Sequence, residues 1–307
     1  MTRLPAFAVT LVLLIVSALS EEVQRETLEG PGVSVMFPPG RESFARSALS
    51  MYAEGLDELE HRLGLSPQRT ASIVLTRTAT EFREITGGRT HPWIAALAYA
   101  SEDLIVIDGS KIEMIGMNDL MTTLTHELTH ILLAQAVEGR DALPLWFNEG
   151  VAVWASAPLF PTPREETILA AKSGRLLHYS ELNDSFPSSH REVELAYAES
   201  HEFISHLETR FGQGTIKAVI GQMKNGASVD DALLQVTHEP LDQLWDEWAA
   251  ELVGRSGVMA VFKLISRHGL PLFGVLAGLV FLGYLRYLLV KRRKMRRWEE
   301  EERMGYW

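Results

Sequence analysis

The stretch His126-Glu127-Leu128-Thr129-His130, with Asn148-Glu149-Gly150 downstream, decides how the rest of this chain is interpreted. Two histidines four residues apart lie on one face of a helix, so His126 and His130 can point their imidazoles at one metal ion. Glu149 stands 19 residues after His130 and supplies a carboxylate as third ligand. Two histidines and a carboxylate leave the fourth position of a tetrahedral zinc ion to water, which is typical of catalytic rather than structural zinc sites.

Glu127 has a different role in this pattern. On a helix it is turned by about 100° from His126. That position lets its carboxylate reach a metal-bound water without occupying a coordination position. Glu127 is therefore the candidate general base.

The sequence around the two histidines predicts a helix from Asn118, as its N-terminal cap, to about Glu138, with Gly139 as a stop. Large apolar residues cover the face opposite the histidines and would anchor this helix in a core. They are Leu120, Met121, Leu124, Leu128, Ile131 and Leu132.

A second helix is predicted at Leu145–Trp154, with Pro144 in its first turn. It would place Glu149 among aromatic and aliphatic side chains. A carboxylate in such surroundings needs a partner, and a metal ion supplies one.

The segment Thr125–His130, followed by Leu143–Ala152 (Leu-Pro-Leu-Trp-Phe-Asn-Glu-Gly-Val-Ala), resembles the gluzincin zinc metallopeptidases. More narrowly, it is similar to their peptidase-MA-like bacterial members, whose second motif resembles Pro-x-Trp-Phe-x-Glu-Gly. The likeness extends over about residues 30–250, and its specific part is residues 118–156. It implies Zn²⁺ held by His126, His130 and Glu149, with Glu127 as general base in peptide-bond hydrolysis.

One departure from the thermolysin-like pattern concerns the support of the ligands. Four residues beyond Glu149 stands Val153, where that pattern has an aspartate. The group that orients a ligand histidine must therefore come from elsewhere in the chain or be a backbone carbonyl.

A metallopeptidase also needs a group that stabilises the oxyanion formed on the attacked carbonyl. The segment Leu195–Ser200 resembles the one that follows the metal motifs in peptidase-MA-like proteins, and its Tyr197 is the candidate donor. A buried structural tyrosine is the alternative. His201, one turn further on, is the second candidate.

Periodicity predicts an α+β lobe with a small mixed sheet before the metal helix, followed by a mostly helical lobe. The resemblance implies a thermolysin-like, two-lobed body. The predicted strands are Val33–Phe37, Ala71–Leu75, Trp93–Ala100 and Leu104–Asp108, and the other predicted helices are Arg41–Leu63, Thr78–Ile85, Glu192–Phe211, Thr215–Met223 and Leu241–Leu252. Trp93–Ala100 is either a sheet edge that pairs with substrate or an ordinary hairpin strand.

The two ends of the chain indicate export and membrane anchoring. Residues 1–20 read as a signal peptide, with an uncleaved anchor as the alternative, and residues 21–256 as an extracytoplasmic domain. Residues 257–290 include a predicted transmembrane helix at about 269–290. The basic tail, 291–307, is expected in the cytoplasm. We therefore expect the chain to be a single-pass protein of the cell membrane.

Charge and composition exclude several other functions. Residues 21–256 hold 36 acidic and 18 basic side chains, which disfavours nucleic-acid binding. The chain has no cysteine, so it has neither disulfides nor thiolate chemistry. We expect a membrane-anchored zinc metallopeptidase acting on peptides or proteins. The alternatives are a catalytically silent, zinc-holding module that binds peptides or assembles a membrane complex, and a metal-free scaffold.

Overall fold

The computed structural model describes residues 24–88, 94–111, 117–137, 143–156 and 165–254, together with Arg286. The described residues from 24 to 252 form one compact unit, which contains the sheet and all the labelled helices. Among the described residues, no helix is both long enough and apolar enough to cross a membrane. The signal peptide and the transmembrane helix expected from the sequence lie outside these residues.

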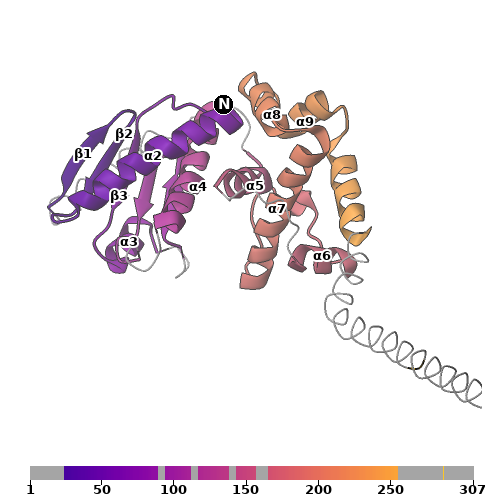
Figure 1. The fold of residues 1–307 in the computed structure, drawn as a ribbon, viewed down its shortest axis with the longest axis horizontal. Helices are drawn as coiled ribbons and strands as arrows, with labels where there is room; N and C mark the ends of the chain where they lie inside the picture. Colours follow the sequence, from indigo (N-terminus) through magenta and orange to yellow (C-terminus); the bar gives the residue numbers. More distant parts are fainter. Residues whose placement is uncertain are drawn as a thin grey trace, which may run out of the picture. The chain divides into compact units, whose positions relative to one another are not determined.

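A mixed sheet forms the first half of this unit (Figure 1). It has five strands, in the order β1-β2-β3-β5-β4. The three central strands are parallel, and each edge strand is antiparallel to its neighbour. This confirms the α+β class and the mixed sheet. The strands are β1 (Glu26–Gly30), β2 (Val33–Phe37), β3 (Ala71–Leu75), β4 (Ala96–Tyr99) and β5 (Leu104–Ile107).

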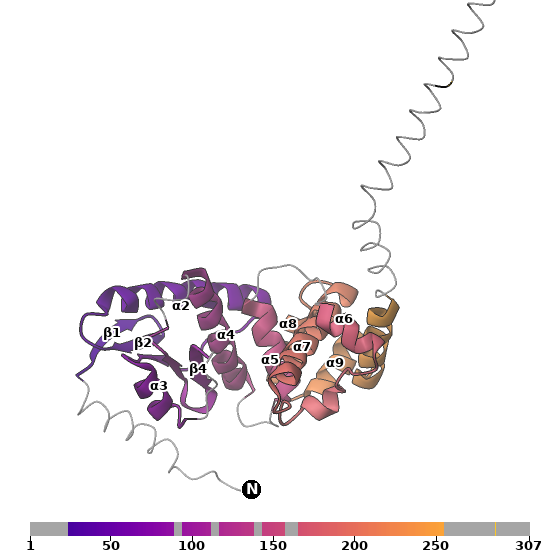
Figure 2. The ribbon, with the colours of Figure 1, turned by 90° about the horizontal axis from the view of Figure 1, so that it is seen from below.

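Helices cover both faces of the sheet (Figure 2). Side chains alternate between the two faces along each strand. One face therefore carries a row of four residues that are paired across four strands: Met36, Val74, Val106 and Leu97. Phe82 of the short helix α3 (Ala79–Ile85) packs on this row. The other face is covered by α2 (Glu42–Leu63) and α4 (Met117–Ala136).

The second half of the unit is helical, as predicted. A cluster of aromatic rings in tilted and edge-to-face contact holds its helices together, with Trp146, Phe203, Trp245 and Trp248 at its centre. The helices are α5 (Leu145–Ser156), α6 (Glu165–Lys172), α7 (His190–Phe211), α8 (Thr215–Lys224), α9 (Val229–Thr237) and residues 241–254, with short 3₁₀ turns at Ala100–Glu102 and Tyr179–Leu182.

Two details of the predicted elements are corrected. Asn118 does not cap the metal helix, because α4 already includes Met117 and so places Asn118 inside it. The strand predicted at Trp93–Ala100 is only four residues long and runs from Ala96 to Tyr99, where the 3₁₀ turn follows. It is an edge strand. The predicted end of the metal helix, Glu138-Gly139, lies outside the described residues.

Candidate metal centre

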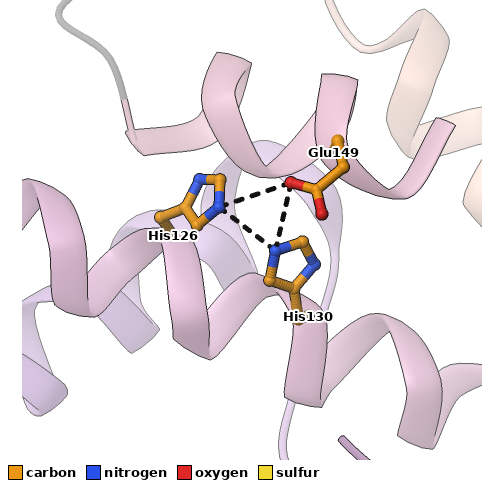
Figure 3. Close-up of side chains that lie close together, drawn as sticks. All are labelled: His126, His130 and Glu149. Atoms are coloured by element: carbon orange, nitrogen blue, oxygen red, sulfur yellow. Dashed lines mark hydrogen bonds and ion pairs between the residues drawn. The ribbon is translucent and has the colours of Figure 1, made fainter. Parts of the chain in front are cut away.

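Packing of α4 against the sheet orients both histidines. Leu124, Leu128 and Ile131 are buried at 1% exposure or less, and α4 contacts β4 and β5 on that side. The 3.6-residue period then turns His126 and His130 to the opposite side, toward α5 (Figure 3). The predicted apolar face is thus the surface that fixes the direction of the histidines.

The helix α5 brings the third residue to the same place. It begins at Leu145, as predicted, and Trp146, Phe147 and Val151 are completely buried. A Cβ atom at Gly150 would lie only 2.7 Å from the backbone oxygen of Ser200 in α7. The absence of a side chain at this position therefore allows α5 and α7 to touch directly beside Glu149.

His126, His130 and Glu149 meet between α4 and α5 (Figure 3). The two Nε2 atoms are 3.1 Å apart, and each lies 3.5 Å from Oε2 of Glu149. All three side chains are mostly buried, with 22%, 11% and 14% of their surface exposed, respectively. One ligand atom from each residue can therefore face one point.

This geometry fits a tetrahedral metal ion. Zinc–ligand bonds of about 2.0–2.2 Å place neighbouring ligand atoms about 3.3–3.6 Å apart, and the three observed separations are 3.1, 3.5 and 3.5 Å. Oε2 of Glu149 is buried and makes no hydrogen bond with the described residues. A positive charge stabilises such an atom, and either a protonated imidazole or a metal ion between the two rings would supply it.

Electrostatic coupling within the triad is strong. Burial would lower the pKa of His130, but the carboxylate of Glu149 outweighs it and raises the pKa to about 9. Burial would raise the pKa of Glu149, but His130 and His126 lower it to about 2. Without a metal the site therefore holds an imidazolium–carboxylate pair at neutral pH, and a divalent cation would replace the proton.

Asn148 supports one of the histidines. Its Oδ1 lies 3.0 Å from Nδ1 of His130, so it accepts a hydrogen bond when that nitrogen carries the proton. This tautomer leaves the lone pair of Nε2 directed at the metal position. The sequence left this supporting group open, and the structure assigns it to the residue directly before Glu149.

Glu127 and Tyr197 both lie near the triad. The side chain of Glu127 is buried, and its charge raises the pKa of His130. Burial, together with the charges of Glu149 and Glu127, raises the pKa of Tyr197 above its usual range. Tyr197 therefore stays protonated at neutral pH and can donate a hydrogen bond.

His201 contacts two polar residues of its own helix. Its Nε2 lies 3.4 Å from Oγ of Ser205, and its Nδ1 lies 4.0 Å from Oε1 of Glu202. The charges of Glu149 and Glu127 reach Tyr197, which makes Tyr197 the better candidate of the two for stabilising an oxyanion.

Comparison with known families agrees with this site. A family model described as the Peptidase MA superfamily matches residues 47–254, about two thirds of the 307 residues. The match includes the whole of α4, α5 and α7. The search of curated proteins found no match.

Proposed function

This chain belongs to the Peptidase MA superfamily, and from that premise we propose that it is a zinc-dependent metallopeptidase. The observation that carries the proposal is the convergence of His126, His130 and Glu149, whose ligand atoms all lie within 4.8 Å of one another. Two imidazoles and one carboxylate are a donor set that suits catalytic zinc. Zinc held there would supply an activated water and polarise the carbonyl of the peptide bond.

The remaining steps belong to side chains of this chain. Glu127 accepts the proton of the attacking water and delivers it to the nitrogen that leaves. Tyr197 donates a hydrogen bond from its hydroxyl to the oxygen of the attacked carbonyl. Asn148 holds His130 in the tautomer and orientation that direct Nε2 toward Glu149.

Cleavage of a peptide library by the full-length protein tests the proposal. The native protein should produce defined fragments in mass spectrometry, and Glu127→Gln should produce none. Glu84→Gln, at an exposed glutamate of α3, is the matched control and should cleave like the native protein. If native protein with bound zinc cuts nothing, the alternative of a silent zinc-holding module gains support. Equal cleavage by the native protein and Glu127→Gln would show that Glu127 is not the general base.

We also propose that the peptidase domain is extracytoplasmic and anchored by one transmembrane helix at about 269–290, with peptides or proteins as substrates. The support is the sequence alone: residues 269–290 contain one charged residue, Arg286, and residues 291–297 contain six basic ones. Protease treatment of intact spheroplasts tests the orientation. Digestion of the domain with protection of the tail is expected, and the reverse pattern would contradict the proposal.

A further inference from the structure

A groove of about 370 Å³ lies between α2 and the turn that joins β1 to β2. Its apolar lining comes from both sides: Pro31 and Val33 belong to the turn and β2, and Leu49, Ala53 and Leu56 belong to α2. Leu49 and Leu56 are only partly buried. The volume lies within the range of sites that bind ligands in proteins.

Direct contacts between the two sides fix the shape of this groove. The hydroxyl of Tyr52, which lines the groove, donates a hydrogen bond to the carbonyl of Gly32 at 3.0 Å and so ties the turn to α2. A Cβ atom at Gly30 would lie only 2.8 Å from Cδ2 of Leu49, so the end of β1 packs closely on the helix. A ligand would therefore meet a preformed surface and would not have to order it on binding.

The charged residues of the groove all have the same sign. Glu29 stands on the strand side, and Asp57 and Glu60 stand on α2, three residues apart and hence on neighbouring turns of one face. All three are exposed. Carboxylates on both sides of an apolar floor attract cationic groups, and they repel nucleic acid and anionic lipid headgroups.

The length of the groove corresponds to a short segment of polypeptide. Leu49 and Leu56 are seven residues apart, which places them on the same face of α2 two turns apart. The distance from Leu49 to Glu60 is eleven residues, or about 16 Å along the helix axis. Because an extended chain advances about 3.3 Å per residue, about five residues fit along this distance.

We propose that this groove binds a short segment of a partner protein in which leucine, or another large apolar residue, is flanked by lysine or arginine. The apolar side chains of that segment cover Leu49 and Leu56, and its cations meet Glu29, Asp57 and Glu60. The inference goes beyond the proposed function, because the groove contains none of the three metal ligands and none of the residues assigned to the reaction.

Binding of a fluorescein-labelled peptide, Gly-Lys-Lys-Leu-Leu-Arg-Lys-Gly, to the full-length protein tests the proposal. Fluorescence anisotropy is measured with EDTA present, so that metal-dependent cleavage does not consume the probe. One comparison peptide has alanine in place of both leucines, and another has glutamate in place of the basic residues. The native protein should bind the first peptide at least about tenfold tighter than either of the others.

Matched variants locate the binding. Asp57→Lys should weaken binding of the basic peptide about tenfold and strengthen binding of the glutamate peptide, and this gain shows that the variant is folded. Glu54→Lys makes the same change of charge at an exposed position of α2 outside the lining, and should bind like the native protein. Leu56→Ala should lose the preference for leucine over alanine, whereas Leu234→Ala, at an exposed leucine of α9, should retain it.

Three results would overturn the proposal. The first is equal binding of all three peptides by the native protein. The second is an equal effect of Asp57→Lys and Glu54→Lys, which would mean that the peptide responds only to the overall negative charge. The third is failure of every peptide to bind while analytical ultracentrifugation finds a dimer that Leu56→Ala dissociates, since the groove would then be covered by a second copy of the chain.

Discussion

Asn148 Oδ1 lies 3.0 Å from Nδ1 of His130, while the next residue, Glu149, faces Nε2 of the same ring at 3.5 Å. Two consecutive residues of α5 therefore contact both nitrogens of one histidine. Asn148 fixes the direction of the ring, and Glu149 shares the metal position with it. Val153 stands where the thermolysin-like pattern has an aspartate that orients a ligand histidine. The contact between Asn148 and His130 supplies that orientation instead.

Substitution of Asn148 tests this support. Asn148→Ala should weaken zinc binding by about 10- to 100-fold, because the ring of His130 loses its orienting hydrogen bond. Asn148→Asp keeps an acceptor at the same place and should bind zinc at least as well as the native protein. Competition with a fluorescent chelator measures both affinities. Equal losses in the two variants would mean that Asn148 acts through packing rather than through this hydrogen bond.

Gly150 should tolerate no side chain. In Gly150→Ala the new methyl group would lie 2.7 Å from the oxygen of Ser200 and 2.9 Å from Cγ1 of Ile204, so α5 or α7 must shift. We expect a loss of about 1–3 kcal/mol in the free energy of unfolding, together with weaker metal binding, because Glu149 is the neighbouring residue. Urea denaturation and metal titration measure the two effects.

A matched glycine in α8 supplies the control for this prediction. A Cβ atom at Gly221 meets no atom within 4 Å, so Gly221→Ala should raise the stability by about 0.5–1 kcal/mol through helix propensity. If both variants gain stability, the close contact between α5 and α7 is not as tight as described.

Arg62 of α2 supports the C-terminal end of α5. Its guanidinium donates hydrogen bonds to the carbonyls of Ala155 and Trp154 and lies 3.9 Å above the ring of Trp154. Arg62→Ala should lower the free energy of unfolding by about 2 kcal/mol. Arg46→Ala, which breaks only an exposed pair with Glu42, should change it by less than about 0.5 kcal/mol. Comparable losses in thermal or urea denaturation would argue against a special role for Arg62.

Glu199 should make stability depend on pH. It is completely buried in α7, and burial raises its pKa to about 8, with the charge of Glu181 adding to this effect. The folded protein then keeps a proton that the unfolded chain releases above pH 4.5, so stability falls as the pH rises from about 4.5 to 8. The slope is at most about 1.4 kcal/mol per pH unit.

The variant Glu199→Gln checks this pH dependence, because glutamine resembles the protonated acid. Its stability should match that of the native protein near pH 5 and exceed it increasingly up to pH 8 in urea denaturation. Glu194→Gln, at an exposed position of the same helix, should follow the native curve at every pH. Parallel curves for native protein and Glu199→Gln would show that Glu199 is already ionised when folded.

Much of the fold could be predicted from the sequence where burial follows a simple period. Val33–Phe37 and Ala71–Leu75 are apolar strands in the interior of the sheet, and the structure has them with the predicted bounds. The strand β1 (Glu26–Gly30) was not predicted, because it is a largely exposed edge strand with the polar sequence Glu-Thr-Leu-Glu-Gly. The short helix α9 was not predicted because nine residues give too few turns for a clear period, and α6 lies in a stretch predicted as helical without bounds.

The candidate site was predictable to the extent that helical spacing determines it. The four-residue interval places His126 and His130 together, and the apolar surroundings of Glu149 require a partner for its carboxylate. Asn148 could not be assigned from the sequence, because no fixed interval relates a supporting amide to a metal ligand. Its contact with His130 depends on how α5 crosses α4.

Zinc content is the most direct test of the central claim that His126, His130 and Glu149 hold a catalytic metal. Full-length protein, Glu127→Gln, His130→Ala and His61→Ala would be purified in parallel, dialysed against trace zinc, and measured by inductively coupled plasma mass spectrometry. The account predicts about one zinc per chain in the native protein, in Glu127→Gln and in His61→Ala, whose histidine is exposed on α2, and none in His130→Ala. Native protein without zinc, or His130→Ala with a full complement of it, would contradict the account.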